Sequence, residues 1–281
     1  MNKAIWIVVA IGTVIAVATL VFLYGRMPEW PETEGTAVPQ PSAPAPRAAE
    51  PPAAEPPAAE PPAAEPDIRY PVPAPEVTEP PPPLPALEES DGAIRDSLAQ
   101  GFGEMHVEAF LIPTQIIRHF VATIDSLDRD PVPLHFRPIK HVPGLPVVKA
   151  EGDRISLSRD NAKRYAPFIS ALRAAGAKQL ADLYLRYYPL FQKAYEDLGY
   201  PDRYFNDRLI DVMDHLLAAP EIEGPIKLVQ PKVLYQFADP ELEKRSWGQK
   251  ALIRMGPANA AAVKEKLREI RDLIAVKAEM P

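Results

Sequence analysis

Three parts of the chain differ in the pattern of their hydrophobic and polar positions. Residues 4–24 form an uncharged apolar run, residues 27–86 combine proline with small and acidic residues, and residues 87–281 place apolar side chains three and four positions apart. These patterns are typical of a membrane-spanning helix, an extended spacer and a helical globular domain. We therefore expect a mainly α fold, with an anchor at 1–26, a disordered spacer at 27–86 and a helical domain at 87–281.

The first apolar run is long enough to cross a membrane. Its 21 residues rise about 1.5 Å each, which matches a hydrocarbon core of about 30 Å. Trp6 and Tyr24 stand at its ends, where such rings prefer the interface. A cleaved signal peptide is the alternative, but no small-residue cleavage site follows the run, so we expect an uncleaved anchor. Lys3 and Arg26 nearly balance, and the short N-terminal tail favours a cytoplasmic N terminus.

The spacer contains 21 of the 36 prolines and a repeat of the type Ala-Ala-Glu-Pro-Pro between residues 48 and 66. Proline is excluded from helix interiors and central strands, and few large apolar side chains are present to form a core. Ten acids against two bases also make the segment repel itself. We expect an extended spacer that holds the domain away from the membrane. A ligand for SH3-like modules is the alternative, which the glutamates disfavour.

The apolar spacing in the domain predicts helices separated by turns. Ser90 is a candidate N-cap for a helix to about Gln100. Pro113 suits the first position of a second helix, whose apolar positions continue to Leu127. Ser158 is a candidate cap for a third.

A small β component is also expected. Residues 147–150 and 154–157 flank Glu151-Gly152-Asp153, which predicts a β-hairpin. Residues 221–238 read as a loop with short extended pieces.

Two strongly patterned helices follow the hairpin region and form a predicted αα-hairpin. The first is apolar on two faces up to Gly199, which predicts burial at the centre of the domain, with a kink at Pro189. The second is expected to open at Pro201 and to stop before Pro220.

The C-terminal part predicts two more helices. Asp239 with Pro240 starts one, and Gly256 with Pro257 breaks the chain before the last. The last helix has apolar residues at intervals of three and four: Ala260, Val263, Leu267, Ile270 and Ile274. We expect this face to dock onto the domain's own core. A short coiled coil is the alternative, which would give self-association through 258–276.

Composition excludes several classes of chemistry. No cysteine is present, which rules out disulfides and a catalytic thiol. The net charge of −7 arises in the spacer, because residues 87–281 carry 27 bases and 28 acids. No basic block indicates nucleic acid as a partner. The five histidines lack the spacing of a zinc-binding helix, and no phosphate-binding or nucleophile motif occurs, so we predict no catalytic residues, metal or cofactor.

The best polar candidate for a binding site is the helix after Pro201. Arg203, Asn206, Asp207 and Asp211 lie on one face and predict a carboxylate-rich ligand surface. The alternative is a solvated face, with ion pairs between residues four apart, Arg203 to Asp207 and Asp211 to His215.

Aromatic residues give a second candidate. Tyr188 and Tyr200 belong to a dense group of rings that would line a peptide or glycan groove beside Pro189, although such stripes also occur in cores. Trp247 lies in a charged stretch and is a candidate for a half-exposed interface position.

Three runs carry a resemblance to a known family: Tyr187-Tyr188-Pro189-Leu190-Phe191, then residues 199–208 (GYPDRYFNDR), then residues 231–240 (PKVLYQFADP). By these runs, residues 84–275 resemble the bacterial domain-of-unknown-function family numbered 3014. The resemblance implies an envelope protein of Gram-negative bacteria and no assigned activity. Together with the expected anchor and its cytoplasmic N terminus, this predicts a single-pass protein of the inner membrane, with the C-terminal domain in the periplasm.

Two classes of function remain open. The first is a non-enzymatic interaction or scaffold module that engages an envelope protein or the cell wall. The second is an enzyme that processes cell-wall glycan or peptide through carboxylates such as Asp207 or Asp211, which requires a carboxylate pair across a cleft. With reversed topology, the domain would instead be a cytoplasm-facing scaffold.

Overall fold

The computed structural model describes residues 68–73, 82–130 and 136–276. The chain splits into two compact units, and every described residue belongs to the unit that contains Pro66–Pro281. The expected anchor at 4–24 and residues 27–67 of the expected spacer lie outside the described residues. Among the described helices, none is both long and apolar enough to cross a membrane.

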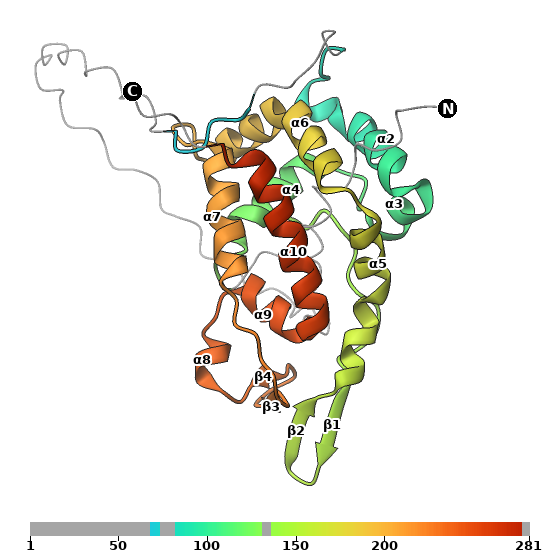
Figure 1. Cartoon of the computed structure of the whole chain (residues 1–281), viewed down its shortest axis with the longest axis vertical. Helices are drawn as coiled ribbons and strands as arrows, with labels where there is room; N and C mark the ends of the chain where they lie inside the picture. The colour runs from blue at the N-terminus through green and yellow to red at the C-terminus, as the bar shows by residue number, and fades with distance from the viewer. Residues whose placement is uncertain (1–67, 74–81, 131–135, 277–281) are drawn as a thin grey trace, which may run out of the picture. The chain divides into compact units, whose positions relative to one another are not determined.

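The described fold is mainly helical, as expected, with one small sheet (Figure 1). The α-helices are α2 (Ser90–Phe102), α3 (Glu104–Phe110), α4 (Ile116–Ser126), α5 (Ala166–Ala174), α6 (Ala177–Asp197), α7 (Phe205–Leu217), α8 (Pro240–Glu243), α9 (Trp247–Met255) and α10 (Pro257–Ile274). Two 3₁₀ helices precede α2 and α5: Leu87–Glu89 and Arg159–Tyr165.

The core lies between α4, α6, α7 and α10. In Figure 1, α7 and α10 lie side by side, and α10 also packs against α5, α6 and α9. The buried apolar positions of α10 are those with the predicted spacing, from Ala260 to Ile274. The prediction that this face docks onto the domain's own core is therefore confirmed. The face is not free to form the alternative coiled coil.

Helix α6 is the central helix that its two apolar faces predicted. Leu180, Leu183 and Phe191 have no exposed surface, because neighbours cover the helix on more than one side. The helix runs without interruption from Ala177 to Asp197, although Pro189 has no N–H to donate.

The predicted β-hairpin is confirmed and is part of a larger sheet. Strands β1 (Val148–Glu151) and β2 (Arg154–Leu157) pair antiparallel around Gly152, whose φ of 58° suits the turn. The region predicted as short extended pieces supplies β3 (Lys227–Val229) and β4 (Gln236–Phe237), which gives the order β1-β2-β3-β4. A small second core packs on this sheet.

Several helix starts differ from the sequence prediction. The helix expected from Pro113 begins at Ile116, because the distant Asp91 accepts the Ile116 and Gln115 N–H groups at 2.8 and 2.7 Å. Ser90 does not cap α2; its hydroxyl donates to the Leu87 carbonyl.

The two remaining predicted caps behave as expected, whereas one more helix starts later than predicted. Ser158 and Asp239 accept backbone N–H groups of the turns that they begin. The helix expected from Pro201 starts later, at Phe205, after a turn that includes Asp202.

Candidate functional site

The start of α7 is held by a side chain of α6. Gln192 accepts the Phe205 N–H at 2.8 Å and donates to the Arg203 carbonyl at 2.9 Å. The first of these hydrogen bonds satisfies a backbone N–H group that the start of a helix leaves unpaired, and the second ties the preceding turn to the same side chain. They fix the orientation of the first turn of α7, which carries Asn206 and Asp207.

A segment of the chain that bends at Arg69 and Tyr70, residues 68–73, lies against this turn (Figure 1, cyan). We call it the docked segment. The Asp207 carboxylate accepts the N–H of Arg69 at 3.0 Å and the N–H of Tyr70 at 2.8 Å, so that its two oxygens bind consecutive backbone amides. A carboxylate in the first turn of a helix is also favoured by the helix dipole.

Two further residues bind the backbone of the docked segment. The fully buried Asn206 amide donates to the Tyr70 carbonyl at 2.9 Å, and the Tyr204 hydroxyl accepts the Val72 N–H at 3.1 Å. Between these contacts stands Pro71, which has no N–H. The site therefore binds the main chain of three residues, Arg69, Tyr70 and Val72.

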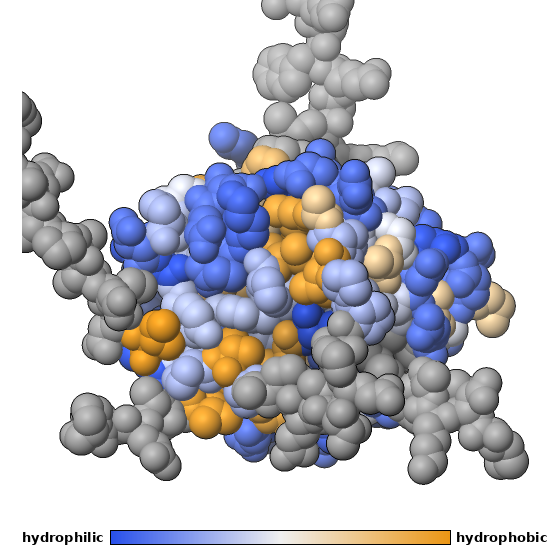
Figure 2. All heavy atoms as spheres, turned by 90° about the horizontal axis from the view of Figure 1, so that it is seen from above, coloured by the Kyte–Doolittle hydropathy of each residue, from blue (hydrophilic) through white to orange (hydrophobic). Residues whose placement is uncertain are grey.

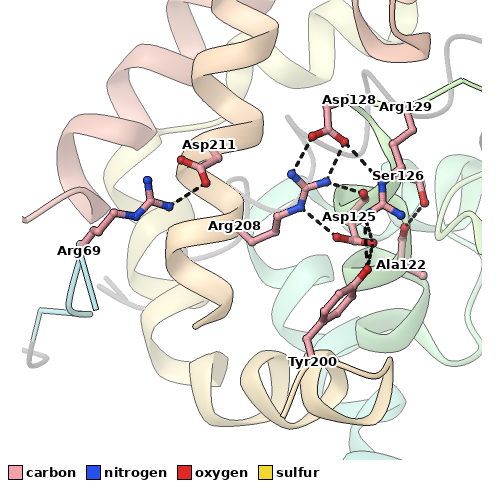
Figure 3. Close-up of polar contacts among 9 residues, drawn as sticks. All are labelled: Arg69, Ala122, Asp125, Ser126, Asp128, Arg129, Tyr200, Arg208 and Asp211. Carbon is pink, nitrogen blue, oxygen red and sulfur yellow. Dashed lines mark hydrogen bonds and ion pairs between the residues drawn. The ribbon is translucent and has the colours of Figure 1, made fainter. Parts of the chain in front are cut away.

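Side chains of the docked segment add charge and apolar contacts. Arg69 donates to Asp211 at 2.7 Å (Figure 3), and this hydrogen bond raises the pKa of the guanidinium. Tyr70 and Val72 are half-buried and pack against the main core. Figure 2 looks onto this end of the domain, where hydrophobic areas lie between hydrophilic side chains.

The docked segment falls within the range that the sequence assigned to the spacer. The structure instead gives residues 68–73 specific partners on α7. The physical reason is local composition, because Arg69 and Tyr70 supply a positive charge and an aromatic ring, which the preceding acidic repeat lacks.

The predicted ion pairs along α7 are replaced by tertiary contacts. Asp207 and Asp211 both face Arg69, while the His215 ring lies 2.7 Å from the Ser246 hydroxyl. Arg203 precedes α7 and places its guanidinium over the Tyr200 ring. The structure thus brings together Asn206, Asp207 and Asp211 of the predicted face, without Arg203.

The predicted tyrosines lie behind the site or beside it. Tyr188 is buried, its hydroxyl donates to Gln192 at 2.9 Å, and its ring lies 5.4 Å from that of Tyr204. Burial raises the pKa of Tyr188 well above its usual range, so it stays a neutral donor. It supports Tyr204 and Gln192, the residues that shape the start of α7.

A second polar cluster binds a neighbouring side of α7 (Figure 3). Arg208 donates to Asp128 twice, at 2.7 Å each, and to the Asp125 carboxylate and carbonyl at 2.9 and 2.6 Å. Tyr200 and Arg129 bind the other Asp125 oxygen at 3.2 and 2.9 Å.

The charges in this cluster stabilise each other. Burial alone would lower the pKa of Arg208, but the hydrogen bonds and charge of Asp128, together with Asp125, raise it above its usual range. Burial alone would raise the pKa of Asp128, and Arg208 outweighs that effect and holds the pKa below its usual value. The cluster ties α7 to the end of α4 and keeps Asp128 ionised.

One family model matches the chain. Its description is "Protein of unknown function (DUF3014)", and it covers residues 116–271. The chain belongs to this family. The DUF3014 match includes α7 with Asp207 and Arg208, whereas the docked segment lies outside it. No curated protein and no solved structure matches the chain.

The remaining predictions about this DUF3014 protein concern Trp247 and metals. Trp247 is only 8% exposed and begins α9. Its backbone N–H donates to the Arg129 carbonyl at 2.9 Å. It is a core residue and not half-exposed. Across the described residues, no group of three His, Cys, Asp or Glu side chains is arranged to hold a metal ion.

Sequence reasoning missed both the docked segment and the Arg208 cluster. Between residues 48 and 81, Arg69 is the one base and Tyr70 the one aromatic residue, and this break in the repeat was the available signal. Arg208 carried no comparable signal, because its partners Asp125 and Asp128 are about eighty residues away in sequence.

Proposed function

We propose that this DUF3014 protein is a non-enzymatic interaction module whose domain binds peptide segments at the start of α7. The observation that carries the proposal is the paired acceptance of two consecutive backbone N–H groups by Asp207. Asn206 completes the arrangement by donating to the carbonyl of the second residue.

Recognition of the main chain suits a peptide ligand for a physical reason. Backbone hydrogen bonds provide affinity that does not depend on the side chains of the ligand, and side-chain contacts then select the sequence. Here Asp211 selects a base, and the surface beneath Tyr70 and Val72 selects apolar groups.

We further propose that the domain works in the periplasm, held by an inner-membrane anchor at residues 4–24 and by the proline-rich spacer. The partner would be an envelope protein or the cell wall. Support comes from the uncharged apolar run and from the acidic, proline-rich composition that follows it. Reporter fusions after residue 281 test the orientation: a periplasm-dependent reporter must be active, and activity of a cytoplasm-dependent reporter would reverse the topology.

Site-directed photocrosslinking in cells tests the interaction role. A photoreactive residue at Leu273 lies beside the site, because it is 39% exposed and the neighbouring Ile274 carbonyl accepts from Asn206. A matched probe at Leu145, which is 78% exposed, lies in the loop before β1. We expect a discrete adduct from Leu273 that is absent from Leu145 and is lost with Asp207→Asn. Adducts that ignore the Asp207 change would overturn the role of this site.

A further inference from the structure

The site on α7 is filled by a segment of its own chain, and its contacts specify what else fits it. We infer that the docked segment is an exchangeable intramolecular ligand, and that the site accepts from a partner a segment of the same chemistry and the same bend: an arginine, then an aromatic residue, then an aliphatic residue two positions later. This inference rests on the proposed function. It adds the class of peptide that binds, and the docked segment as the competitor of that peptide.

Each ligand position is set by one contact. The first residue must place a cation near Asp211 and offer an N–H to Asp207, as Arg69 does. The second must offer an N–H and a ring that packs on the core, as Tyr70 does. The third needs no N–H, because none is bound there, and Pro71 satisfies this condition.

The charge of the site excludes acidic ligands. Asp207 and Asp211 lie one turn apart on α7 and both face the ligand, while the next acid on this side, Asp214, is held by Arg271 of α10 at 2.5 Å. Without the docked segment, two carboxylates at the ligand position lose their cation, Arg69. A basic segment therefore replaces it, and a glutamate-rich one does not.

The structure around the site does not depend on the docked segment. If the segment leaves, the buried Asn206 keeps its hydrogen bonds to the Ile274 carbonyl at 3.2 Å and to Tyr184 at 3.0 Å. Tyr204 keeps its ring contact with Tyr188. The acids become hydrated, so departure leaves no buried polar side chain here without a partner.

The docked segment is also held in a way that permits exchange. Its N–H groups bind side chains and not a neighbouring strand, and the Arg69 and Asp211 side chains are 51% and 47% exposed. Such half-exposed ion pairs are weak in water. A covalently attached ligand still competes strongly, because its effective concentration reaches the millimolar range.

Peptide binding to the full chain tests the inference. The probe is a fluorescent peptide with the sequence of residues 66–75 (PDIRYPVPAP). The receptor is a full-length variant in which glycine and serine replace residues 68–73. We expect saturable binding by anisotropy, at least about ten-fold weaker binding to the wild-type chain, and a loss of about ten-fold or more with Asp207→Asn.

Matched controls separate the site from general charge effects. Asp202→Asn makes the same chemical change at an exposed carboxylate in the turn before α7, and we expect it to leave binding unchanged. A peptide with alanine at the Tyr70 position should bind at least ten-fold more weakly. Binding that is insensitive to Asp207→Asn, or no binding to a folded receptor, would overturn the inference, while the photocrosslinking result would stand independently.

A second measurement needs no variant. Hydrogen exchange of the wild-type chain should show the Arg69, Tyr70 and Val72 amides exchanging through local opening, at least ten-fold faster than the buried amides of α6. Exchange of these three amides at the same rate as the α6 core would mean that the segment leaves only when the domain unfolds. That result would also overturn the inference.

Discussion

Replacing Arg208 with alanine tests whether the polar cluster at the end of α4 holds α7 in place. The Arg208 side chain is only 16% exposed and makes four hydrogen bonds with Asp125 and Asp128. Truncation removes all four and leaves the Asp125 side chain, 7% exposed, with Tyr200 and Arg129 as partners.

The expected loss of folding free energy depends on how well water can solvate each carboxylate after Arg208 is removed. Removal of one partner from a buried ion pair costs about 3–5 kcal/mol. Asp128 is 28% exposed and becomes hydrated, and Asp125 keeps a second cation in Arg129, so the lower end of this range applies. We expect Arg208→Ala to lower the free energy of unfolding by about 3 kcal/mol, and Arg208→Lys by about half as much, because lysine lacks the planar fork.

Urea unfolding of the full chain measures this change. Trp247 is buried and reports on the domain once Trp6 and Trp30 are replaced by phenylalanine. With a slope of about 2 kcal/mol per molar urea, the midpoint should fall by about 1.5 M. Arg203→Ala, an exposed arginine in the turn before α7, should shift it by no more than about 0.3 M. An unchanged midpoint for Arg208→Ala would refute the view that this cluster fixes α7.

Two further predictions concern the contact between α7 and α9. Gly248→Ala would place its Cβ 2.5 Å from the Leu216 side chain and 2.9 Å from the Leu127 carbonyl. We expect this clash to lower the free energy of unfolding, measured by thermal unfolding, by about 1–3 kcal/mol. A neutral result would show that the helices separate freely. Burial lowers the pKa of His215, which lies beside Ser246. The folded state therefore binds a proton at His215 less readily than the unfolded state does. The free energy of unfolding should fall as pH drops below about 6.5. Urea midpoints at about pH 7.5 and 5.5 should differ more for wild type than for His215→Gln, and equal differences would place the pH effect elsewhere.

The helices could be predicted wherever the local sequence determines their ends. Gly199 ended the central helix near the observed boundary, Asp239 capped as expected, and Gly256 with Pro257 separated the last two long helices. In these cases a residue's own backbone preference sets the boundary.

The wrong helix starts share one cause. Pro113 and Pro201 both suit a first helical position, yet each helix begins three or four residues later. At the observed starts, the first N–H groups are bound by Asp91 in one case and by Gln192 in the other. Such caps come from other helices, and local sequence does not reveal them.

The candidate site was partly predictable for a similar reason. Helical spacing placed Asn206, Asp207 and Asp211 on one face, and all three bind the docked segment. The identity of what they bind required the fold, because the partner residues precede them by more than 130 positions.

The two sides of α7 have different tasks because consecutive residues point in different directions. Asp207 faces a ligand that it holds through backbone N–H groups, whereas Arg208 faces α4 and binds carboxylates that belong to the core. A helix fixed on one side keeps the acceptors on its other side in place without a ligand. Binding then loses less conformational entropy than it would at a mobile site. For the proposed peptide-binding function, we expect this preorganisation to let a few contacts select a segment.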